Sequence, residues 1–115
     1  MLLTALGIFA VAAIGGVIMA VRVFGGKMPP WGLSLLHAAF GAAGLVTLGF
    51  AAYEAPGDTL VLTALGLFVV AALGGFFLAS FHLRNRPHPK AVVGLHALLA
   101  VSAFVILGLR AFAVV

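Results

Sequence analysis

The most constraining feature of this chain is an internal repeat that covers almost its whole length. Residues 4–53 match residues 63–112 without a gap when the sequence is shifted by 59 positions, and the tripeptide Leu-His-Ala occurs in both copies. Such a match indicates a duplicated structural unit. It places one histidine at the same point of each copy, namely His37 and His96.

The composition indicates that this chain folds within a lipid bilayer. Of 115 residues, 65% are hydrophobic and 7% are charged, which is too apolar for a small soluble domain, because such a domain leaves much of its chain exposed. A transmembrane helix needs about 20 apolar residues, whereas barrel strands alternate apolar and polar residues. The sequence predicts an all-α bundle of four transmembrane helices in one domain, residues 1–115, with a first repeat at 1–56 and a second at 57–115. The expected helices are 2–23, 31–53, 59–82 and 91–112.

The first helix is expected to stay in the protein rather than act as a signal peptide, because it lacks a basic leading region and its repeat partner lies mid-chain. The absence of cysteine excludes disulfides, iron–sulfur clusters and thiol catalysis.

The distribution of charge predicts the topology. Five of the six basic residues flank the first and third loops, whereas the middle loop, residues 54–58, contains both acidic residues and no base. By the positive-inside rule, both basic loops are expected in the cytoplasm and both termini outside. Arg110 is the exception, and it is expected to reach the interface from the outer end of the last helix. The expected location is therefore the bacterial inner membrane. The sequence contains no basic stripe with interleaved aromatic residues, so nucleic-acid binding is not expected.

Each repeat is predicted to form a helical hairpin: a glycine-rich helix, a basic turn with proline, and a helix with the histidine. The two hairpins run in the same direction, so a pseudo-two-fold axis along the membrane normal is expected to relate them. Small residues at four-residue spacing on the first helix of each copy favour close helix packing. They are Ala12, Gly16 and Ala20, with partners Ala71, Gly75 and Ala79; Gly7 and Gly15, with Gly66 and Gly74, form a second stripe.

The two repeated histidines are the best indication of function. His37 and His96 lie about six residues inside their helices, or roughly 9 Å below the membrane interface. Ionisable residues at that depth usually face the bundle interior and have a partner. The pseudo-axis would bring the two imidazoles to the bundle centre from opposite sides, which is the arrangement that bis-histidine ligation of one haem b requires.

The surroundings of the histidines favour the same interpretation. Small residues on the histidine face of the two helices would leave a slot for a flat macrocycle, and basic residues at the nearby interface could pair with haem propionates. The slot residues are Gly41, Gly44, Ala100 and Ala103, and the basic residues are Arg22, Lys27, Arg84, Arg86 and Lys90.

Other interpretations remain open at this point. The histidines could form hydrogen bonds between helices, or could bind zinc or copper, although two histidines alone are a poor ligand set for those metals. His82 and His88 have no counterpart in the first copy, where Val23 and Pro29 stand. His82 is kept as a reserve ligand, in place of one repeated histidine or for a second haem.

The Leu-His-Ala segments near the start of apolar helices resemble the axial-histidine helices of small four-helix b-type membrane cytochromes. This resemblance implies electron transfer between a quinone or a soluble donor and an acceptor, with the potential tuned by the axial ligands and by burial. Such cytochromes often hold two haems with four ligand histidines, whereas this chain has two well-placed histidines.

Several functions are not favoured. No carboxylate lies within a span, which argues against proton-coupled drug export, and no triad-like set supports hydrolysis. The first hypothesis is a haem electron-transfer protein. The second is a non-catalytic helical subunit of a larger membrane complex or a homo-oligomer, and the third is a small transporter or channel.

Overall fold

A computed structural model describes all residues, 1–115, and contains four α-helices and no strand. They are α1 (Leu2–Phe24), α2 (Trp31–Glu54), α3 (Thr59–Leu83) and α4 (Lys90–Ala111). All four are long and apolar enough to cross a membrane. The predicted all-α bundle of four transmembrane helices is confirmed, and each helix ends within one or two residues of its predicted bounds.

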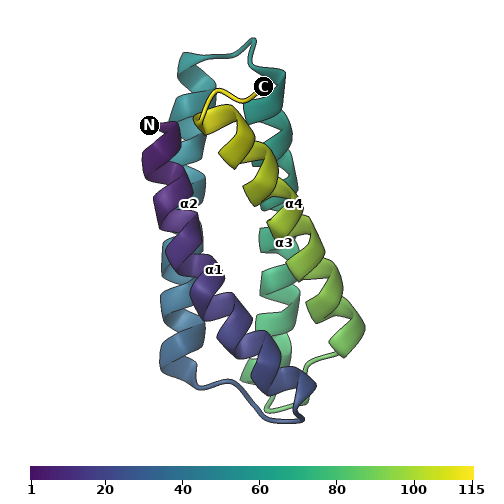
Figure 1. The fold of residues 1–115 in the computed structure, drawn as a ribbon. Helices are drawn as coiled ribbons and strands as arrows, with labels where there is room; N and C mark the ends of the chain where they lie inside the picture. The colour runs from purple at the N-terminus through teal and green to yellow at the C-terminus, as the bar shows by residue number, and fades with distance from the viewer.

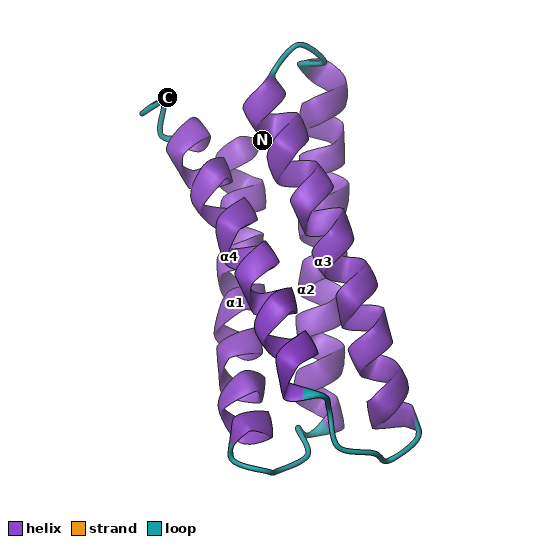
Figure 2. Ribbon diagram, turned by 90° about the vertical axis from the view of Figure 1, so that its right-hand side faces the viewer, coloured by secondary structure: helices purple, strands orange, loops and turns teal.

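The helices run antiparallel to their chain neighbours, so the molecule has two distinct ends (Figure 1). The termini and the α2–α3 loop lie at one end, here called the acidic end because it contains Glu54 and Asp58. The other two loops lie together at the opposite end (Figure 2), here called the basic end. It contains Arg22, Lys27, Arg84, Arg86 and Lys90.

The bundle consists of two tight hairpins. Helix α1 packs most extensively on α2, and α3 on α4, whereas the α1–α4 and α2–α3 contacts are less extensive. The diagonal pairs, α1 with α3 and α2 with α4, have no close backbone contact. Side chains therefore fill the centre of the bundle.

Contacts recur 59 residues apart. The turn after α1 and the turn after α3 use the same hydrogen bonds: Lys27 N–H donates to the Arg22 carbonyl, and Arg86 N–H donates to the Phe81 carbonyl, both at 2.9 Å. Each turn contains a left-handed residue, Gly26 (φ 79°) or Asn85 (φ 52°). This six-to-one bond with a left-handed residue is the Schellman motif, which satisfies carbonyls at a helix end.

The core is built from equivalent residues of the two copies. Near the acidic end, Ala5 and Ala64 are fully buried together with Leu48 and Leu107. One layer deeper, the Phe9 and Phe68 rings stack with their centroids 3.7 Å apart and their planes 3° apart. Because α1 and α3 have no close backbone contact, this ring stack spans the bundle between them.

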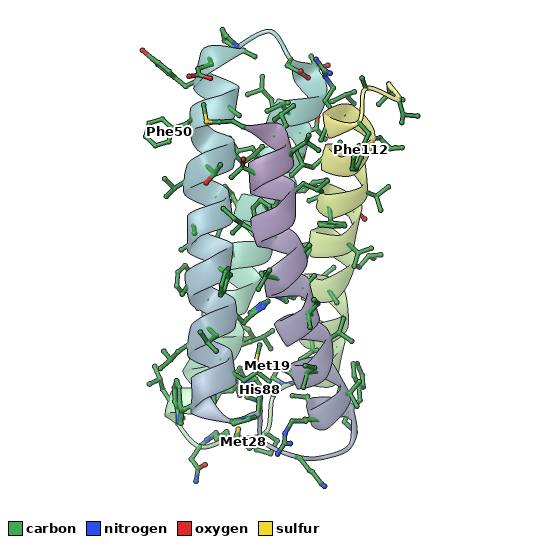
Figure 3. The ribbon with its side chains drawn as sticks, turned by 60° about the vertical axis from the view of Figure 1, so that its left-hand side comes forward. Met19, Met28, Phe50, His88 and Phe112 are labelled. Atoms are coloured by element: carbon green, nitrogen blue, oxygen red, sulfur yellow. The ribbon has the colours of Figure 1, made fainter.

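The outer surface is apolar. Large hydrophobic side chains on all four helices are exposed, among them Phe76 on α3 and Leu98 on α4. Phe50 and Phe112 point away from the bundle in Figure 3. A continuous apolar exterior of this kind is stable in lipid rather than in water, so the chain is an integral membrane protein.

Arg110 does not simply extend to solvent. Its Nε donates to Asp58 Oδ2 at 2.7 Å, and Asp58 Oδ1 accepts from the Val61 backbone N–H, which caps α3. The Val61 hydrogen bond and, against the opposing effect of burial, the Arg110 guanidinium lower the pKa of the Asp58 carboxyl. This ion pair joins the start of α3 to the end of α4. Arg110 was expected to reach the interface from the outer end of the last helix, and its pairing with Asp58 was not predicted.

Candidate functional site

Helices α2 and α4 bring the two repeated histidines together across the bundle. The His37 and His96 ring centroids are 6.1 Å apart, and the ring planes are inclined by 76°. Each histidine lies six residues after its helix begins, at Trp31 or Lys90, and each is partly buried. The sequence-predicted pairing of these two side chains across the bundle is therefore present.

Each imidazole is held by a carbonyl of its own hairpin. His37 Nδ1 lies 2.8 Å from the Ala12 carbonyl oxygen, and His96 Nδ1 lies 2.7 Å from that of Ala71. A carbonyl oxygen only accepts, so Nδ1 carries a proton in both rings, and in the neutral imidazole the lone pair is then on Nε2. The equivalent bonds of the two hairpins thus set the same tautomer.

The two Nε2 atoms have no partner within the protein. Neither Nε2 forms a hydrogen bond within the protein. Because every fully buried side-chain nitrogen and oxygen has a hydrogen-bond partner, both Nε2 atoms must be at least slightly accessible from outside the protein. Nitrogen lone pairs left open within an apolar bundle are suited to a metal ion or a donor supplied from outside the chain.

Glycines of α1 and α3 make room for the imidazoles. A Cβ atom on Gly16 would lie 3.0 Å from His37 Cε1, and one on Gly75 would lie 3.3 Å from His96 Cε1. Gly15 and Gly74 face the Cβ atoms of the same histidines. Helix packing was the role predicted for these glycines, and their contact with the histidines was missed, although the repeat of Gly-Gly in both copies was the available signal.

The small residues predicted to form a slot on α2 and α4 have different surroundings. The ring of Phe9 occupies the space beside Gly44, where a Cβ would lie 2.7 Å from Phe9 Cε1, and the equivalent Ala103 is fully buried. Gly41 has no atom near its Cβ direction, and Ala100 is half-buried. The small residues that touch the imidazoles are therefore those of α1 and α3. Gly7 and Gly66 face open space and pack against nothing.

The two arginines expected near a cofactor lie at the basic end. Arg22, in the last turn of α1, is exposed. Arg84 follows α3, where its Nε donates to the Ser80 carbonyl at 3.1 Å and its guanidinium lies 4.6 Å from the Phe81 ring centre. Neither guanidinium forms an ion pair with a carboxylate.

No family model, no curated protein and no solved structure matches this chain. The interpretation of the site therefore rests on its own geometry.

The arrangement of His37 and His96 limits the kinds of metal site that they could form. No group of three or more His, Cys, Asp or Glu side chains is placed to hold a metal ion. Zinc takes four protein ligands in structural sites and three in catalytic ones. Two imidazoles that approach from opposite sides suit a metal whose remaining ligands come from a cofactor.

Proposed function

We propose that this protein is a small membrane electron-transfer protein that holds one haem b between α2 and α4, with His37 and His96 as its axial ligands. The observation that carries the proposal is the pair of facing imidazoles 6.1 Å apart, each with Nδ1 bonded to a carbonyl. This function agrees with the resemblance of the Leu-His-Ala helices to those of small b-type membrane cytochromes.

The separation of the rings fits a shared iron. A ligating imidazole nitrogen lies about 2 Å from its metal and its ring centre roughly 1 Å farther, so two ligands on opposite sides place their ring centres about 6 Å apart. The 76° inclination of the two ring planes is compatible with this role, because two imidazoles that share one metal need not be coplanar.

The residues of the chain would then have distinct roles. The Ala12 and Ala71 carbonyls fix the tautomer and orientation of the imidazoles and increase their basicity as ligands. Gly16 and Gly75 keep α1 and α3 clear of the rings. Arg22 and Arg84, at the basic end, would pair with propionates. The bound group would supply one-electron chemistry, and the donor and acceptor would be a quinone or a redox partner protein.

A second candidate is a non-catalytic helical subunit of a larger membrane complex. One observation favours it: each histidine already has a hydrogen-bond partner in its own hairpin, which stabilises helix packing without a cofactor. The free Nε2 atoms favour the first candidate, since a purely structural histidine needs no open lone pair.

An absorption spectrum tests the proposal. The protein purified from haem-sufficient cells is expected to show a six-coordinate haem b spectrum that sharpens on dithionite reduction. His37→Ala and His96→Ala should each abolish or shift this spectrum, because each removes one axial ligand. Tyr53→Phe, an exposed position at the acidic end, is the control.

A colourless protein would contradict the cytochrome assignment and leave the structural subunit. Six-coordinate haem retained in both histidine variants would move ligation to His82 or His88.

We also propose that the basic end lies in the cytoplasm and both termini outside, in a bacterial inner membrane, because of the positive-inside bias. The chain lacks cysteine, so single cysteines report topology directly. Gly57→Cys, in the α2–α3 loop, should react with an impermeant maleimide added to spheroplasts, whereas Arg86→Cys should react only after lysis. The reverse pattern would invert the topology.

A further inference from the structure

A second group of polar and aromatic side chains lies at the basic end, away from His37 and His96. The His82 ring stacks on the Trp31 ring with centroids 3.7 Å apart and planes inclined by 12°. His82 is only 5% exposed, and the half-buried ring of His88 lies 5.6 Å from it, centroid to centroid. Figure 3 labels Met19 and His88 at this end of the bundle.

A short hydrogen-bond chain fixes the tautomer of His82. Ser34 Oγ donates to Met19 Sδ at 3.4 Å and lies 3.2 Å from His82 Nδ1. A thioether sulfur only accepts, so the hydroxyl proton points to Met19, and the Ser34 oxygen accepts from the Nδ1–H of His82. The lone pair of His82 therefore resides on Nε2, which has no partner in the protein and is not sealed.

His88 can also offer a free imidazole lone pair. Neither ring nitrogen of the half-buried His88 forms a hydrogen bond within the protein, so a metal ion could bind either one. A neutral ring at physiological pH offers one nitrogen lone pair. Two imidazoles that bind one ion at a bent angle place their ring centres slightly less than about 6 Å apart, in agreement with the observed separation.

We propose that His82 and His88 bind one monovalent copper ion at the basic end of the bundle, through the lone pair of His82 Nε2 and a ring nitrogen of His88. The site belongs to the second repeat alone, because Val23 and Pro29 stand at the equivalent positions of the first repeat.

The donor set selects this ion. Copper in its reduced state accepts two imidazole ligands, whereas magnesium and calcium require oxygen ligands. Both carboxylates, Glu54 and Asp58, lie at the opposite end of the bundle, and the chain has no thiolate. The absence of a third histidine or an acid nearby argues against zinc. The bond from His82 Nδ1 to Ser34 is the outer-shell contact that metal-bound histidines usually make.

The test is a competition titration on the full-length protein in detergent. Metal-free protein is titrated with Cu(I) against a chromogenic Cu(I) chelator, with ascorbate present to keep the copper reduced. The wild type should bind one equivalent. His88→Ala should weaken binding by at least about 100-fold, and Ser34→Ala by about 10- to 100-fold, since outer-shell partners have effects of that size.

Two variants separate ligand loss from misfolding. His88→Met keeps a soft ligand in the same loop and should retain most of the Cu(I) affinity that His88→Ala loses. Leu83→Ala removes an exposed side chain next to His82 and should bind like the wild type. Helix content by circular dichroism should be the same in all variants.

Equal affinity in the wild type and His88→Ala would overturn the proposal. So would Cu(I) binding that persists in His88→Ala and is lost in His37→Gln, since the ion would then lie at the central pair. Neither result depends on whether haem is bound, so this test is separate from the spectrum of the central site.

Discussion

Phe9→Ala is expected to lower the free energy of unfolding by about 3–5 kcal/mol, the usual cost of removing a buried aromatic side chain. Phe9 is 5% exposed. Its ring fills the space beside Gly44 and stacks on Phe68, which makes it the main link between α1 and α3. Unfolding by SDS titration in mixed micelles, followed by circular dichroism, measures the loss.

The control for this prediction is Phe76→Ala, because Phe76 is 73% exposed on the outer face and its loss should change the unfolding free energy little. The double variant Phe9→Ala/Phe68→Ala should be less destabilised than the two single variants together, by about 0.5–1.5 kcal/mol, because the stacked pair is lost only once. Additive effects would show that the stack contributes nothing beyond burial.

Gly16→Leu is expected to remove the haem from the proposed site and to destabilise the bundle by about 1–3 kcal/mol or more. Even a Cβ at this position would lie 3.0 Å from His37 Cε1 and 3.4 Å from Nδ1. A leucine must therefore push the imidazole away from the Ala12 carbonyl or separate α1 from α2. Haem content per protein and SDS unfolding report the two effects.

Gly7→Leu is the matched control, with the same substitution on the same helix. Gly7 has no atom within 4 Å of its Cβ direction, and leucine is a better helix former than glycine. This variant should keep its haem and be at least as stable as the wild type. Normal haem content in Gly16→Leu would show that Gly16 does not border the cofactor.

The fold was predictable because its main determinants are long and regular. Four apolar runs of helix length favour a bundle of membrane-spanning helices in lipid, and the repeat places the two histidines at equivalent points of the sequence. The choice of contacts was harder to predict. Gly41 and Gly44 have the same side chain and lie on the same helix face as His37, yet Phe9 packs against one of them and nothing packs against the other.

Which glycine receives a ring depends on the rotation of α1 relative to α2, and hydropathy carries no information on rotation when a helix is apolar on every side. The same limit applies to the basic end. There the Trp31 and His82 rings stack, and His82 is buried at 5% exposure while Trp31 is 45% exposed. Neither residue has the same residue type at the equivalent position of the other copy, where Lys90 and Val23 stand, so symmetry gave no guidance there.

The two hairpins determine different properties of the central histidine pair. Each imidazole takes its orientation from a carbonyl within its own hairpin, whereas the distance between the rings is set by the less extensive α1–α4 and α2–α3 contacts. Ligand orientation and ligand separation are thus encoded on separate surfaces. Substitutions between the hairpins can change the spacing of the pair while each half retains its tautomer, and two separately expressed halves would each contain a correctly oriented histidine.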